Sequence, residues 1–350
     1  MTLQDVLFTI VRFSLWNERF DEEVFTSFSE NDWRELYLLT NKQGLSAIFA
    51  DGIGKLSQKS PVCMQLLLEE GIPAIIQAEN CWDEQLKLAT KLANTLEKNG
   101  VRMLLLKGIG LSQCYPEPKH RESGDIDIYL FGDYEMGNSL AEKKLGAVVE
   151  KFSKKEDHIV IGDYQFDNHI CFVWPANRKK AEFDAYLKGL LEKVKLPRLA
   201  DTSILLPPAN FNLLFLLSHS YSHFMREGML LRQMTDMACF LKKYESELDW
   251  IECLEVLKRF GLKKYGDAVI AFVSEYFEIE FVYKPEVAKQ TLECMKDDIL
   301  DGDHTMVYPN SRLASKIYIA MNAWQNRWRY DAFYEGGFWR FIVDSVFKLA

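Results

Sequence analysis

Two aspartates, Asp125 and Asp127, stand two residues apart in an apolar stretch of the chain. In a β-strand such residues share one face about 6.6 Å apart along the chain, so both carboxylates project together while Ile126 and Ile128 point the other way. Two like charges on a buried strand are costly unless a cation lies between them. Carboxylate oxygens are the ligands that Mg²⁺ prefers in proteins. The pair therefore predicts a metal site for Mg²⁺, or for Mn²⁺.

A third carboxylate is expected from a neighbouring strand, because sites that bind two metal ions for phosphoryl transfer usually have one. The segment Gln165-Phe-Asp167-Asn-His169 offers it, since strand alternation places its first, third and fifth side chains on one face. We predict that Asp167 is a metal ligand. His169 is interpreted as a phosphate contact or a supporting group. The alternative for both is an ordinary polar face of an antiparallel strand.

The residues upstream of the aspartate pair suit a ligand that carries phosphate groups. Lys107-Gly108 follows the apolar run 101–106, and a glycine turn after a buried strand lets backbone N–H groups approach a phosphate closely. Lys107 adds a positive charge, and Arg121, in the loop that ends at Gly124, is within reach of the same ligand. The alternative for Arg121 is a surface charge. We predict that Lys107, Gly108, Arg121 and Gly124 contribute to nucleotide binding.

These residues require a small α/β unit to position them. The pattern predicts a buried strand at 101–106, a helix at 108–114, a strand at 125–131 and a helix to residue 145 with Asp133 as its N-cap. Strands are predicted at 147–152, 158–161 and 164–172, the last two joined by a hairpin turn at Gly162-Asp163.

Helical periodicity dominates the rest of the chain. We predict an N-terminal helical region at 1–99, an α/β core at 100–176 and a C-terminal helical domain at 177–350. A polar loop is predicted at 301–311, and the aromatic tail from Ile317 is expected to pack on the domain. The fold class is therefore α+β, with a mixed sheet embedded in a mostly α-helical chain.

Composition limits the class of protein. The chain has 350 residues, 48% of them hydrophobic, and 42 basic against 51 acidic side chains give a formal net charge of -9. Broad binding to nucleic acid needs a basic surface, so we exclude it as the main activity. The seven cysteines form no C-x-x-C pair, and the N-terminus lacks a basic leader. No run reaches the ~18 apolar residues of a membrane span, and we predict a cytoplasmic protein without membrane partners.

The motifs together resemble the nucleotidyltransferase superfamily, and within it a bacterial group of uncharacterised nucleotidyltransferases. The resemblance covers most of residues 30–275 and runs through Lys107-Gly108, Tyr115-Pro116, Arg121, Gly124-Asp125-Ile-Asp127, Asp167-x-His169, His219-x-x-x-His223 and Arg232-x-x-x-Asp236. It implies a nucleotidyltransferase-like mixed sheet in which the Gly108 turn holds the triphosphate, Asp125 and Asp127 bind Mg²⁺, and Asp167 is the third carboxylate. Members commonly have Gly-Ser or Gly-Gly at the turn, where this chain has Gly108-Ile109.

Two further pairs lie in the helices after the core. His219 and His223 have the i, i+4 spacing that can chelate a metal, although packed histidines are the simpler interpretation without a third ligand nearby. Arg232 and Asp236 have the spacing of an ordinary helix ion pair. The resemblance favours an acceptor or nucleotide pocket for both pairs.

These inferences predict an Mg²⁺-dependent nucleotidyltransferase that moves an NMP from an NTP to an unidentified acceptor, a small molecule or a protein, with release of pyrophosphate. Asp125, Asp127 and Asp167 are its predicted catalytic residues, and Asp167 is also the candidate acceptor of a proton. Two alternatives remain open. One is a catalytically inactive nucleotide-binding or regulatory protein, which the unusual Gly108 turn would favour, and the other is a metal-dependent phosphohydrolase that uses the same carboxylates.

Overall fold

The computed structural model describes residues 2–18, 20–302 and 312–344. The described residues within 1–212 and 238–247 form one compact unit, and the described residues within 213–237 and 248–344 form the other. The division falls within helices α9 (Ala209–Phe224) and α10 (Leu231–Tyr244). Both predicted domain boundaries, after residues 99 and 176, lie inside the first unit, and the division into three regions stays a prediction.

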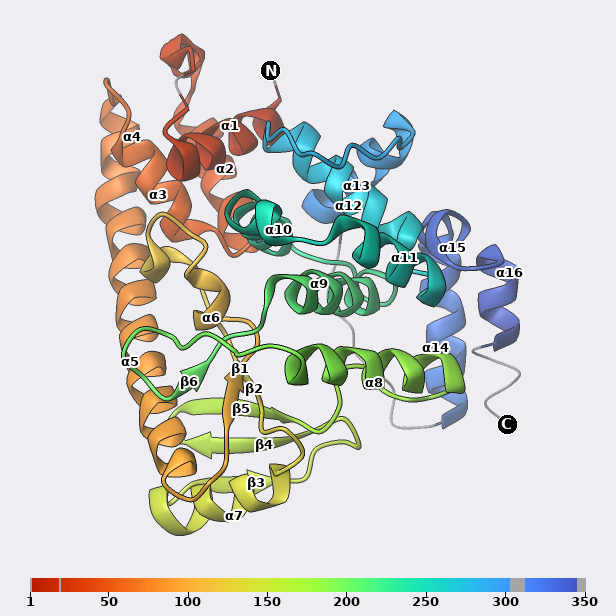
Figure 1. Ribbon diagram of the computed structural model, residues 1–350. Helices are drawn as coiled ribbons and strands as arrows, with labels where there is room; N and C mark the ends of the chain where they lie inside the picture. The colour runs from red at the N-terminus through yellow and green to blue at the C-terminus, as the bar shows by residue number, and fades with distance from the viewer. Residues whose placement is uncertain (1, 19, 303–311, 345–350) are drawn as a thin grey trace. The chain divides into compact units, whose positions relative to one another are not determined.

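The first unit contains a mixed six-stranded sheet (Figure 1). Its order is β3-β4-β5-β2-β1-β6, and the strands are β1 (Met103–Leu105), β2 (Ile126–Tyr129), β3 (Val148–Glu150), β4 (Glu156–Ile161), β5 (Tyr164–His169) and β6 (Ile204–Leu205). The pairs β2–β5 and β1–β6 are parallel, and the other neighbours are antiparallel. The predicted α+β class with a mixed sheet is confirmed. Strand β6 was not predicted, because it is too short to show an alternation pattern.

Helices make up most of the remaining first unit. They are α1 (Leu3–Trp16), α2 (Glu30–Lys42), α3 (Ser46–Gly54), α4 (Pro61–Leu66), α5 (Ile72–Glu97), α6 (Ile109–Ser112), α7 (Tyr134–Leu145) and α8 (Arg178–Glu192), with short helical turns η1 (Glu22–Ser27), η2 (Leu67–Gly71), η3 (Pro118–His120) and η4 (Glu245–Glu247).

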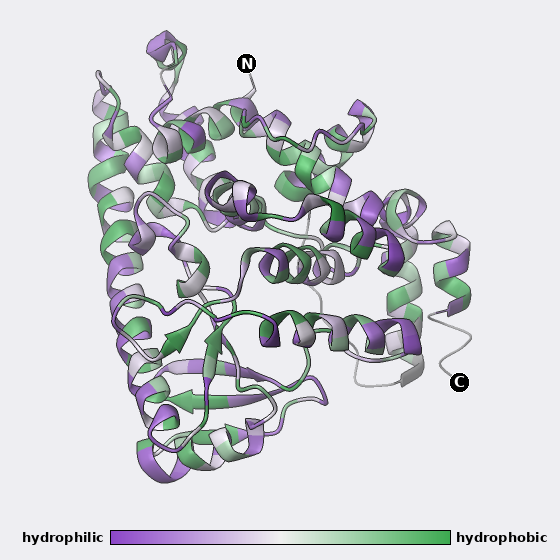
Figure 2. Ribbon diagram, viewed as in Figure 1, coloured by the Kyte–Doolittle hydropathy of each residue, from purple (hydrophilic) through white to green (hydrophobic). Residues whose placement is uncertain are grey.

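The long helix α5 lies beside the sheet and supplies one side of the core (Figure 1). Its buried residues include Ala89, Leu92 and Leu96, spaced three and four apart as the face of an amphipathic helix requires. Figure 2 shows both hydrophobic (green) and hydrophilic (purple) residues along the whole length of α5. Ala89, Leu92 and Leu96 pack in one cluster with apolar side chains of the strands, among them Ile126 and Phe166. This cluster therefore covers one face of the sheet. Asp127, Asp167 and His158 lie on the other face, which we call the polar face.

The hairpin of β4 and β5 sets the register of those polar residues. Its two-residue turn is Gly162-Asp163, as predicted, and the positive φ of 61° at Gly162 suits glycine at the first position of a tight hairpin turn. The pairing places His158 opposite Asp167 and Glu156 opposite His169. Because side chains on a strand alternate between faces, these four residues share one face of the sheet.

Asp133 occupies the N-cap position of the following helix, as predicted, but its side chain does not cap that helix. Asp133 directly precedes α7, but its side chain accepts no hydrogen bond from the first turn of this described helix. Its backbone, with φ of -83° and ψ of 28°, lies outside the extended region that a capping side chain needs.

The second unit is helical. Besides its parts of α9 and α10 it contains α11 (Trp250–Phe260), α12 (Lys263–Tyr276), α13 (Lys289–Asp301), α14 (Arg312–Gln325), α15 (Arg327–Phe333) and α16 (Gly337–Ile342). Arg329 is 3% exposed and binds both carboxylate oxygens of Asp298, at 2.6 and 2.7 Å.

The predicted packing of the aromatic tail is confirmed for Tyr330, Phe333 and Phe338, which are buried. The predicted polar loop lies outside the described residues from residue 303 onward. Among the helices that the structure describes, none has the length and apolar content of a membrane span.

Candidate active site

The parallel pairing of β2 and β5 brings two of the three predicted metal ligands together. Asp127 and Asp167 are register partners, although 40 residues separate them in the chain. Neighbouring strands lie about 4.8 Å apart, so the two carboxylates extend side by side from the polar face of the sheet. The pairing of Ile126 with Phe166 places the apolar neighbours of both residues on the opposite face.

Asp125 differs from what the alternation pattern predicted. It precedes the strand, which begins at Ile126, and its side chain is exposed, whereas Asp127 is 7% exposed. The expectation of two buried like charges on the strand is therefore wrong, because the strand is four residues long and leaves Asp125 in the preceding loop. Asp125 is still close enough for its charge to raise the pKa of Asp167.

Two basic side chains of the protein contact Asp127. Lys107 Nζ lies 2.9 Å from Asp127 Oδ1, and His169 Nε2 lies 3.0 Å from the same oxygen. His169 is 1% exposed and comes from β5. The sequence pattern predicted that a metal ion compensates the charges of the aspartates. In the structure, side chains supply part of that compensation for Asp127.

Asp167 lies in the most acidic part of this face. Burial raises the pKa of Asp167, and the charges of Asp127, Asp125 and Glu156 raise it further. A hydrogen bond of 2.8 Å from Gln165 Nε2 to Asp167 Oδ1 acts in the opposite direction. The ionised form of Asp167 is therefore disfavoured in the metal-free protein, as expected for a carboxylate that a cation would stabilise.

The chain turns sharply at Gly108, between β1 and α6. Gly108 has φ of 55° and ψ of -121°, a conformation that L-residues rarely adopt. A Cβ atom at this position would lie 3.0 Å from Ser123 Oγ, so the loop before β2 closes against the turn. Helix α6 has only four residues, and its dipole is correspondingly small. The role of Gly108 in phosphate binding stays a prediction that depends on the turn amides and Lys107.

Arg121 and Gly124 lie in the loop between η3 and β2. Arg121 is 7% exposed and donates a hydrogen bond of 3.2 Å to the carbonyl of Glu122, so the interpretation as a surface charge is wrong. Gly124 is exposed, and Gln85 Nε2 on α5 donates to its carbonyl oxygen at 2.6 Å. Helix α5 thus fixes the loop that presents Asp125, while both nucleotide-binding roles remain predictions.

Glu156 and His158 were not among the predicted site residues. One ligand atom from each of Glu156, His158 and Asp167 lies within 4.8 Å of the other two, the one such group of potential metal ligands among the described residues. A signal for them was present, because the two-residue turn Gly162-Asp163 fixes which residues of β4 oppose Asp167 and His169. The predicted strand began at residue 158 and so excluded Glu156, whereas β4 begins at Glu156.

The two helical pairs lie in the second unit, while the three carboxylates lie in the first. The His219 and His223 rings are 4.5 Å apart between centroids, and His223 Nδ1 is in hydrogen-bond contact with the carboxylate of Glu227, in the turn that follows α9. Asp236 is 7% exposed on α10. The assignment of these histidines, Arg232 and Asp236 to an acceptor or nucleotide pocket stays a prediction.

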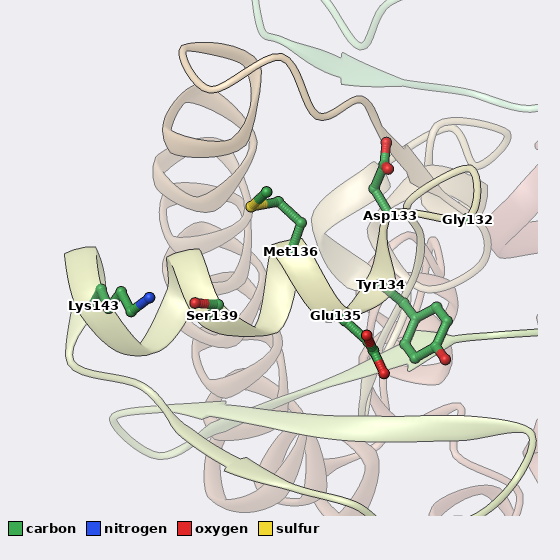
Figure 3. A pocket seen from close by; sticks show the side chains of 7 residues that line it. All are labelled: Gly132, Asp133, Tyr134, Glu135, Met136, Ser139 and Lys143. Carbon is green, nitrogen blue, oxygen red and sulfur yellow. The ribbon is translucent and has the colours of Figure 1, made fainter.

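A shallow pocket lies at the start of α7 (Figure 3). Its lining runs along that helix from Gly132 and Asp133 to Ser139 and Lys143, and includes none of the three carboxylates. Asn138 of α7 bonds Asp157 and Asn168, whose side chains leave the sheet on the face opposite to Asp127 and Asp167. This pocket therefore does not belong to the acidic site.

A mixed sheet with clustered carboxylates beside a glycine turn is the arrangement that the resemblance to nucleotidyltransferases implies. The family described as uncharacterised nucleotidyltransferase matches residues 29–278, and the chain belongs to this family of nucleotidyltransferases. The match spans the sheet and all the predicted site residues. Searches of curated proteins and of solved structures found no match.

Proposed function

We propose that this chain is an Mg²⁺-dependent nucleotidyltransferase that transfers an NMP from an NTP to an acceptor, a small molecule or a protein. The observation that carries the proposal is the pairing of Asp127 with Asp167 across β2 and β5, with Asp125 near both. These three carboxylates provide hard oxygen ligands, and hence fit Mg²⁺ or Mn²⁺. When bound, such an ion neutralises phosphate charge and orients the reacting oxygens.

The side chains have separate tasks in the proposed reaction. Lys107 is held beside the aspartates by its contact of 2.9 Å with Asp127, where its charge can offset that of the triphosphate. Arg121 and the Gly108 turn would bind phosphate oxygens. An acceptor oxygen attacks the α-phosphorus. The bond between the α-phosphorus and the oxygen that bridges the α- and β-phosphates breaks, and pyrophosphate leaves with that oxygen. Asp167 accepts the proton that the acceptor loses.

The test uses the purified full chain, Mg²⁺ and isotopically labelled NTPs with a pool of small-molecule and protein acceptors. Mass spectrometry of the pool should show an NMP mass increment, accompanied by equimolar pyrophosphate. The double variant Asp125→Asn/Asp127→Asn should abolish both signals. Asp163→Asn provides the matched control, because it removes an exposed carboxylate of the β4–β5 turn, away from the cluster.

Three outcomes separate the proposal from its alternatives. Labelled acceptor with pyrophosphate supports transfer. Rapid NTP hydrolysis without any labelled acceptor would identify a phosphohydrolase, and nucleotide binding without turnover across the pool would identify an inactive binding protein.

A cytoplasmic location and the absence of broad nucleic-acid binding also remain predictions from the sequence.

A further inference from the structure

A second group of ligands adjoins the proposed Mg²⁺ site on the polar face of the sheet. Glu156 and His158 of β4 and Asp167 of β5 each place one ligand atom within 4.8 Å of the others. We propose that these three residues bind a divalent transition-metal ion of the Zn²⁺ type. The inference rests on the proposed function only in that Asp167 is common to both sites.

The donor set distinguishes this group from the aspartates around Asp127. His158 contributes an imidazole nitrogen, a ligand that suits Zn²⁺ and other late first-row ions, whereas Mg²⁺ prefers oxygen ligands and water. Three protein ligands of the histidine and carboxylate type leave one tetrahedral position for water or substrate. The chemistry of the group therefore favours a transition metal.

The spacing of the ligand atoms also fits an ion. His158 Nε2 lies 3.6 Å from Asp167 Oδ1, which is too long for a hydrogen bond. Two ligands bound at about 2.1 Å with tetrahedral geometry are about 3.4 Å apart. Small side-chain shifts would therefore bring this pair to the separation that a metal requires.

His158 is held in place by an aromatic contact. The Phe152 ring stacks on the imidazole, with centroids 4.0 Å apart and planes inclined by 22°. The side chains of His158, Glu156 and Asp167 are 12%, 16% and 16% exposed, so the group is partly buried yet open to an ion from solution. An imidazole fixed by stacking loses little freedom when it binds a metal.

Basic side chains already surround the carboxylate of Glu156. His169 Nδ1 and Lys155 Nζ each lie 3.4 Å from Glu156 Oε2, and His169 also contacts Asp127 through Nε2. These contacts hold Glu156 on the same face as His158 and Asp167, in the position that a ligand of a shared ion requires.

The experiment is a metal titration of the chelator-treated full chain, without nucleotide and with Mg²⁺ in excess. Zn²⁺ is followed by calorimetry, Co²⁺ by its electronic absorption, and Cu²⁺ by pulsed electron paramagnetic resonance, which detects a coordinated nitrogen. One Zn²⁺ per chain should bind in the presence of Mg²⁺. His158→Gln and Glu156→Gln should each weaken Zn²⁺ binding at least about tenfold, and His158→Gln should remove the nitrogen signal.

Asp163→Asn is the matched control and should leave Zn²⁺ affinity unchanged. Circular dichroism confirms that each variant is folded. The proposal would be overturned if Mg²⁺ displaced Co²⁺ at equal concentration, or if the nitrogen signal were unchanged in His158→Gln. Asp125→Asn separates the two sites, because it should lose Mg²⁺-dependent nucleotide binding and keep Zn²⁺ binding. Intact Zn²⁺ binding in a wild-type chain that binds no nucleotide would refute only the proposed function.

Discussion

Asp127 and Asp167 occupy equivalent positions on the parallel strands β2 and β5, yet their surroundings differ. Asp127 contacts two basic side chains, Lys107 and His169, through one carboxylate oxygen. Asp167 accepts a hydrogen bond from neutral Gln165 and lies near the negative charges of Asp127, Asp125 and Glu156. The two carboxylates therefore affect stability in opposite directions when no metal is bound.

Asp127→Asn should destabilise the metal-free protein by roughly 1 to 3 kcal/mol, because it removes the charged partner of a largely buried lysine. The side chain of Lys107 is 20% exposed. Asp125→Asn serves as the comparison, since exposed Asp125 should change stability by less than about 0.5 kcal/mol. Urea denaturation of both variants in a chelating buffer measures the difference. Equal effects would contradict the importance of the pair between Lys107 and Asp127.

Asp167→Asn should leave the metal-free protein as stable as the wild type or more stable at pH 7. The pKa of Asp167 is raised above its ordinary value of 3.8. Protonated Asp167 therefore makes its full contribution to the free energy of unfolding below pH 3.8. This contribution is lost as the pH rises through the higher pKa of the folded state. The advantage of the variant should disappear at low pH. Thermal denaturation between pH 3 and pH 8 tests this.

The same variant should respond less than the wild type to added Mg²⁺. A ligand that binds only the folded state raises its stability, and the asparagine removes one ligand charge. If the melting temperatures of both proteins rise equally with Mg²⁺ concentration, Asp167 is not a ligand.

His120 should make stability depend on pH near neutrality. Burial alone would lower the pKa of His120, but Asp51 Oδ2 at 2.6 Å and Glu79 Oε1 at 3.2 Å outweigh it, and the pKa is raised above 6.5. The stabilisation is then fully present below pH 6.5 and is lost as the pH rises through the folded-state value. His120→Gln should cost about 1 to 2 kcal/mol at pH 6 and less at pH 9.

Lys119→Gln provides the control for this pH dependence. Lys119 pairs with Asp83 on the surface, and the ordinary pKa values of lysine and aspartate side chains lie outside the range from pH 6 to pH 9. Any effect of this variant on the free energy of unfolding should be constant across that range. A constant effect of His120→Gln as well would exclude His120 as the titrating group.

Gly108→Ala should destabilise the protein by about 1 to 3 kcal/mol, because alanine is strained in this backbone conformation. The φ of Gly108 is 55°, and the new methyl group would lie 3.0 Å from Ser123 Oγ. Gly124→Ala is the matched comparison, since a Cβ there would meet no described atom within 4 Å. It should leave the melting temperature unchanged. Nucleotide titrations of this folded variant then measure whether Gly124 lies at the ligand.

The sequence by itself determined the local features of the site. Strand alternation placed Asp125, Asp127 and Asp167 among the candidates, and the pair Gly162-Asp163 predicted the hairpin that β4 and β5 form. Such features depend on neighbouring residues, whose periodicity and turn preferences are visible in one chain. The same reasoning exaggerated the burial of Asp125, because alternation does not reveal where a strand begins.

Only the tertiary structure decided how the strands are ordered. The parallel pairing of β2 with β5, and the antiparallel pairing of β5 with β4 on its other side, place Asp127, Asp167 and His158 in one row across the sheet. They also place buried His169 between Asp127 and Glu156. Strand order depends on contacts between segments far apart in the chain, and local sequence patterns do not specify those contacts. The ligands available to a metal on this face were therefore apparent only in the folded sheet.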